Sequence, residues 1–258
     1  MPHNAVLHRR VFLPLLLALI ALAWALLWAW AAGPYAVYLS HGDWRGPLAA
    51  LCRTAPPWLV SGGLSALAWL LMSAAMMLPT TLPLVDAMAR LTAGRADRGR
   101  LLALLLGGYL LAWGLFGFVV HGLHGVLLGA GLERLAPGWL LAAATLALAG
   151  AFQFSRLKQL CLEKCRTPLS FVMQHWRGGA HPGRQAFALG AHHGVFCIGC
   201  CWALMLLMFI VGMGQLGWML ALAAVMAAEK NLPWGRRLSA PLGVALLGGA
   251  LALVLARP

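Results

Sequence analysis

The sequence predicts an all-α integral membrane protein, a bundle of about seven transmembrane helices with its N-terminus in the cytoplasm and its C-terminus outside. The first observation is composition: 62% of the residues are hydrophobic and the mean hydropathy is +0.83, well above the range of soluble proteins. The second is that the apolar residues form continuous runs of about 20, the length that crosses a hydrocarbon core. Continuous runs rich in Leu and Ala favour helices over the alternating strands of a barrel.

The apolar runs define the predicted spans in chain order. They are Val11–Ala32, Trp58–Leu78, Leu101–Gly122, Trp139–Leu157, Phe187–Met213, Leu216–Ala228 and Leu238–Ala256. The first run is too long for a typical signal peptide and is interpreted as an uncleaved span. Because proline removes a backbone donor and bends a helix, the second span is expected to continue, kinked at Pro79, toward Ala87. The third can run on to Leu128.

Basic residues fix the predicted orientation. With the N-terminus inside, 15 of the 19 Lys and Arg residues fall in cytoplasmic segments, and the other four are Arg45, Arg53, Arg134 and Arg257. The positive-inside rule therefore accounts for the net charge of +13, and no nucleic-acid partner is expected. The chain is interpreted as a single integral domain over residues 1–258, embedded in the lipid bilayer of the cytoplasmic (inner) membrane.

The fifth span carries an unusual row of sulfur and imidazole side chains. At about 100° per residue, His193, Cys197, Cys200 and Cys201 share one helical face with Leu204 and Met208, while His192 points elsewhere. Thiolate and thioether ligands select Cu(I), and thiolate with imidazole suits zinc, so copper is expected first and zinc second. One straight helix cannot close four such positions on a single ion. We therefore expect a further soft ligand from another helix, Met76 or Met77 of the second span.

A second thiol pair lies at the cytoplasmic end of the fourth span. Cys161 and Cys165 are four residues apart and share a face if the helix persists that far. Cytoplasmic thiols stay reduced, so metal ligation or reversible redox chemistry is more plausible there than a structural disulfide. Cys52 faces outward with no evident partner. Glu229, at the end of the sixth span, is expected to pair with Lys230 or with a loop arginine.

The leading interpretation is a membrane protein that binds copper or zinc, for metal handling or as a subunit of a metal-dependent membrane complex with a membrane or soluble protein partner. Two alternatives remain. The thiols can serve a metal-independent thiol oxidoreductase, or they can simply pack in a structural or assembly subunit. No phosphate-binding glycine motif or Ser-His-Asp pattern is evident, and no particular reaction follows from the sequence.

Several motifs carry a resemblance to a known family. They are Trp69–Pro79, Gly108–Trp113, Leu157–Phe171, His175–Gly178, His193–Met205, Gly217–Met219 and Glu229–Gly235. These pieces, the His-Gly-x-x-Cys-x-Gly-Cys-Cys-Trp motif above all, resemble a domain-of-unknown-function family described as predicted metal-binding integral membrane proteins. The resemblance covers about residues 58–235 and implies metal binding at the thiols. The family pattern Tyr-Gln-x-x-Pro is replaced here by Phe152-Gln-Phe-Ser-Arg156.

Overall fold

The computed structural model describes residues 13–32, 57–129, 138–211 and 215–256, and these residues contain helices and no strand. The helices are α2 (Leu13–Ala32), α4 (Pro57–Leu91), α5 (Arg98–Gly129), α7 (Gly138–Phe152), α8 (Arg156–Arg166), α9 (Pro168–His175), α10 (Pro182–Val211), α11 (Leu216–Asn231), the 3-10 turn η3 (Gly235–Leu238) and α12 (Ser239–Leu255). The all-helical fold is confirmed. Cys52 and the outer loop around it lie outside the described residues.

Five of the described helices, α2, α4, α5, α10 and the segment ending in α12, are long and apolar enough to cross a membrane, and the bent pair α7–α8 makes a possible sixth. The predicted sixth span corresponds to α11, which has 16 residues and is shorter than these five. The count of seven spans therefore stays a prediction. Helix α4 is mostly buried, whereas α2 and α12 expose most of their apolar side chains.

Helix α4 continues through Pro79 and Pro83 as far as Leu91, so the predicted extension past Pro79 is present. Pro79 has no N–H to donate to the carbonyl of Ala75, and the indole of Trp24 on α2 donates to that oxygen at 3.1 Å instead. This bond satisfies a backbone carbonyl in the apolar interior, so the helix continues, and Met77 is buried.

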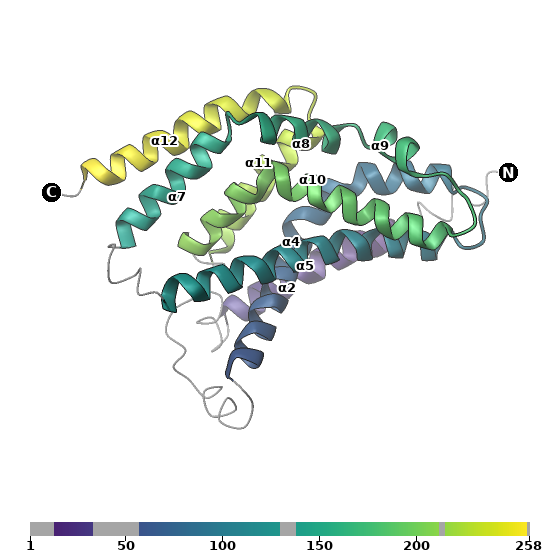
Figure 1. Ribbon diagram of the computed structural model, residues 1–258, viewed down its shortest axis with the longest axis horizontal. Coiled ribbons are helices and arrows are strands. Elements are labelled where there is room, and N and C mark those ends of the chain that lie inside the picture. The colour runs from purple at the N-terminus through teal and green to yellow at the C-terminus, as the bar shows by residue number, and fades with distance from the viewer. Residues whose placement is uncertain (1–12, 33–56, 130–137, 212–214, 257–258) are drawn as a thin grey trace.

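Helices α5 and α10 run side by side across the molecule (Figure 1). Small residues allow this contact: a Cβ on Gly108 would collide with the Phe187 carbonyl oxygen, and one on Gly190 with the Leu105 carbonyl oxygen. Glycine at such positions lets two helix backbones approach closely, as is common in membrane interiors. This contact fixes the position of α10 against α5, and with it the position of the α10 cysteines in the bundle.

The contact predicts that alanine substitutions at two neighbouring glycines differ sharply in their effect on stability. Gly108→Ala forces α5 away from the α10 backbone and should destabilise the protein by about 1–3 kcal/mol, as overpacking does. Gly107→Ala should be tolerated, because nothing lies within 4 Å of a Cβ built there. Thermal unfolding of the two variants in detergent measures the difference. Equal melting temperatures would contradict the close packing of α5 on α10.

The predicted fourth span, Trp139–Leu157, ends earlier than expected. Helix α7 stops at Phe152, and α8 leaves it at an angle of 63°. The Ser155 hydroxyl accepts a hydrogen bond from the Lys158 backbone N–H at 3.1 Å and so caps the start of α8. Helix α7 packs against α12, and α8 lies against α10 (Figure 1). The chain beyond the predicted fourth span is therefore helical in α8 and α9.

Candidate metal-binding site

The centre of the candidate site is a buried group of sulfur atoms from two helices. Cys201 of α10 places its Sγ 3.9 Å from the Met77 Sδ of α4. The ammonium nitrogen of Lys230, on α11, lies 2.9 Å from Cys197 Sγ, 3.8 Å from Cys201 Sγ and 3.6 Å from Met77 Sδ. All four side chains are buried. The expected soft neighbour from the second span is thus present, and it is Met77.

Cys197 has two polar neighbours that distinguish it from the other thiols. Besides the Lys230 ammonium, the hydroxyl of Tyr109 on α5 lies 3.0 Å from its Sγ. Cys200 and Cys201 instead donate their own thiol hydrogens to the Cys197 backbone carbonyl, at 3.0 and 2.9 Å. An ammonium beside a sulfur favours its thiolate form, which is the form that binds a metal. Cys197 is therefore a candidate metal ligand.

The two predicted thiol sets meet in the structure. Cys165 on α8 lies with its Sγ 4.0 Å from Cys200 Sγ on α10. The Cys161 side chain lies against Gly199, where an added Cβ would come within 2.6 Å of the Cys161 sulfur. Both α8 thiols are 8% exposed, more than the 1% of the α10 thiols. The thiols of α8 and α10 therefore lie together, and those of α8 are slightly more exposed.

His193 is buried one turn from Cys197, with its ring packed between Tyr109 and Phe171. Its Nδ1 atom is buried and has no hydrogen-bond partner among the described residues. His192, as predicted, points away from this row; it is exposed and its ring contacts His175. A buried imidazole nitrogen without a partner is compatible with a ligand that binds there.

The carboxylate of Glu229 pairs with neither of the partners that the sequence suggested. It accepts two hydrogen bonds from the ammonium of Lys158, at 2.8 and 2.9 Å, and one from Ser239 at 2.8 Å. Lys158 also binds Gln153, and Arg166 binds the Glu229 backbone carbonyl. The expected pairing with Lys230 or a loop arginine is wrong, because the bend between α7 and α8 brings Lys158 into the interior. These bonds hold α8 against the end of α11, beside the sulfur cluster.

Lys230 is the site residue that the sequence analysis missed. Its partners are Met77 and Cys197, which are 153 and 33 residues away in the sequence. A lysine in an apolar helix was the available signal, since such residues usually face an interior site.

The donors that surround this point fit one kind of metal better than another. Within the described ranges, no group of three or more His, Cys, Asp or Glu side chains is arranged to hold a metal ion. Structural zinc requires four such ligands, so zinc is not supported. Two thiols and a thioether are soft ligands, and cuprous ions accept a pair of soft ligands in a linear arrangement. The donor set therefore fits Cu(I).

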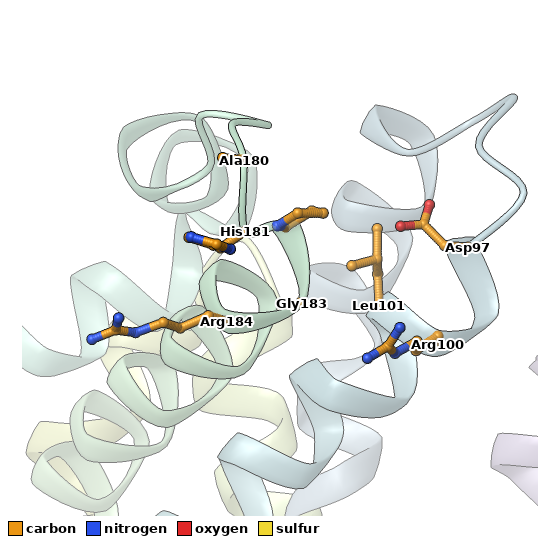
Figure 2. Close-up of a pocket in the computed structure, with 8 residues that line it drawn as sticks. Asp97, Arg100, Leu101, Ala180, His181, Gly183 and Arg184 are labelled. Carbon is orange, nitrogen blue, oxygen red and sulfur yellow. The ribbon is translucent and has the colours of Figure 1, made fainter.

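A separate surface hollow of about 380 Å³ lies between the start of α5 and the start of α10 (Figure 2). Asp97 and Arg100 line one side, and His181 and Arg184 line the other. A hydrogen bond from the Arg95 guanidinium lowers the pKa of the Asp97 carboxyl. None of the lining residues is a cysteine or methionine, so this hollow is distinct from the sulfur cluster.

The fold and the cluster together define a helical protein with candidate membrane spans and a buried set of soft metal donors. The family model PpoB2, described as a copper chaperone, matches residues 66–253. The chain therefore belongs to this copper chaperone family. The match supports the metal-related family that the sequence motifs suggested for residues 58–235. No match was found among curated proteins or among solved structures.

Proposed function

We propose that this protein is a membrane-embedded copper chaperone that holds Cu(I) between Cys197 and Cys201 with Met77 beside them. The observation that carries the proposal is the convergence of two thiols and a thioether, from α10 and α4, around one buried point. Cys200 and His193 lie on the same face of α10 and complete the soft surroundings. Copper is the cargo of such a protein, so a partner must supply it and another must receive it.

The thiols of α8 provide a path by which Cu(I) can reach the α10 thiols. Cys161 and Cys165 are slightly more exposed than the α10 thiols, and Cys165 contacts Cys200. Cu(I) can pass from one thiol pair to the next by exchanging one sulfur ligand at a time, without being released as a free ion. We propose that Cys161 and Cys165 take copper from a donor and that Cys200 passes it to Cys197 and Cys201.

The membrane setting is part of the proposal. The exposed faces of α2 and α12 consist of large apolar side chains, among them Leu15, Leu22 and Leu251, which lipid would cover. We propose seven spans in the inner membrane, with the N-terminus in the cytoplasm and the C-terminus outside, because of the excess of basic residues in alternate segments. Reporter fusions at Asp97 and Pro258 should give opposite sidedness. Matching sidedness would contradict this topology.

Copper loading tests the function directly. The full-length protein, purified in detergent and reduced, is mixed with excess Cu(I), separated from unbound metal and measured by elemental mass spectrometry. A copper chaperone should retain at least one Cu(I) per chain, and binding should weaken at acid pH, because protons compete for the thiolates. A protein that retains no copper would contradict the proposal. A disulfide between Cys165 and Cys200 after mild oxidation, without copper binding, would favour a thiol oxidoreductase.

A further inference from the structure

Lys230 brings a positive charge into direct contact with the sulfur cluster. Its ammonium nitrogen is buried and has the sulfur atoms of Cys197, Cys201 and Met77 as its neighbours. The neighbouring carboxylate of Glu229 does not neutralise it, because that group already forms an ion pair with Lys158. A buried charge is very unfavourable unless another charge balances it. The group placed to balance the Lys230 charge is therefore Cys197, whose sulfur lies 2.9 Å away.

Charge balance then distinguishes between metals. A cuprous ion with two thiolates carries one net negative charge, and one ammonium beside it makes the whole group neutral. A zinc ion with the same two thiolates is already neutral, so the ammonium would leave an unbalanced positive charge in the interior. In an apolar interior the neutral arrangement is strongly preferred. The Glu229 carboxylate does not change this balance, because it is paired with Lys158.

We infer that Lys230 is the resident counter-ion of the bound Cu(I) and that its charge makes the site select Cu(I) over Zn(II). The inference rests on the copper-binding function proposed above. Loading conserves charge throughout. Cu(I) leaves the thiolate of its donor, bonds form from copper to the Cys197 and Cys201 sulfurs, the Cys201 proton leaves for solvent or for the donor thiolate, and no electron is transferred. The flexible Lys230 side chain gives up the central position and stays beside the sulfurs.

Variants of Lys230 separate the effect of its charge from the effect of its shape. Lys230→Gln keeps a hydrogen-bond donor but removes the charge, Lys230→Met removes both, and Lys230→Arg keeps the charge. Each full-length variant is loaded in detergent with an equimolar mixture of Cu(I) and Zn(II), and the ratio of bound copper to bound zinc is measured by elemental mass spectrometry. We expect this ratio to fall about tenfold or more in the Gln and Met variants, a factor that corresponds to about 1.4 kcal/mol. The Arg variant should keep most of the wild-type preference.

Lys164→Met is the control, because it removes one lysine charge from an exposed position on α8. Its copper-to-zinc ratio should equal that of the wild type. A Lys230→Gln variant that keeps the wild-type ratio would overturn the counter-ion role while leaving the copper function intact. A wild-type protein that binds no copper would instead overturn the proposed function.

Discussion

Cys197→Ser and Cys201→Ser are each expected to reduce bound copper by at least about tenfold. Serine keeps nearly the same shape but replaces a soft thiolate with a hard hydroxyl that does not ionise at neutral pH, and Cu(I) requires soft ligands. Cys197 should be the more sensitive of the two, because the Lys230 ammonium and the Tyr109 hydroxyl both converge on its sulfur. Elemental mass spectrometry of the copper-loaded full-length variants measures the loss.

Cys52→Ser is the control for these variants, since the sequence analysis assigns Cys52 no role in metal binding. It should retain wild-type copper. Thermal unfolding in detergent should show that the two α10 variants remain folded, because serine introduces little change in volume. If the Cys197→Ser/Cys201→Ser double variant is folded and retains its copper, these thiols pack in the bundle rather than ligate metal.

Glu229→Gln should destabilise the protein by about 3–5 kcal/mol, the usual effect of removing one partner from a buried ion pair. The Lys158 and Glu229 side chains are 0% and 3% exposed, so the ammonium that remains has no access to water. Lys158→Met should destabilise to a similar extent. The Lys158→Met/Glu229→Gln double variant should recover part of this loss, because no unpaired charge is left in the interior.

The ion pair between Arg90 and Asp86 on α4 provides the comparison. Its side chains are 78% and 54% exposed, so Asp86→Asn should change stability by less than about 1 kcal/mol. Thermal or denaturant unfolding in detergent measures all of these variants. Equal stability of Glu229→Gln and Asp86→Asn would show that the Lys158–Glu229 pair does not hold α8 against α11.

Patterns within single helices predicted much of this structure. The apolar runs placed most helices within a few residues of their observed ends, because hydrophobicity alone marks a buried or lipid-facing helix. The row from His193 to Cys201 lies on one buried face because helical periodicity requires it. Met76 or Met77 was expected as a soft neighbour because the predicted topology places both thioethers at about the depth of the thiols in the fifth span.

Long-range pairing could not be predicted in the same way. The bend after Phe152 lays α8 against α10, where Cys165 meets Cys200 and Lys158 meets Glu229. Ser155 was the one local signal for it, as a residue that commonly caps a helix start. Lys230 looked like a loop-end residue beside Glu229. Its contacts depend on where α4, α10 and α11 meet in space.

X-ray absorption at the copper edge tests the central claim most directly. The full-length protein is loaded with Cu(I) in detergent, washed and measured beside the Cys197→Ser/Cys201→Ser variant. The wild-type spectrum should show reduced copper with sulfur as its nearest neighbours, as expected for two thiolates with the Met77 thioether close by. This sulfur shell should be absent from the variant. Copper surrounded by nitrogen or oxygen in the wild type, or an unchanged sulfur shell in the variant, would contradict a Cu(I) site at this cluster.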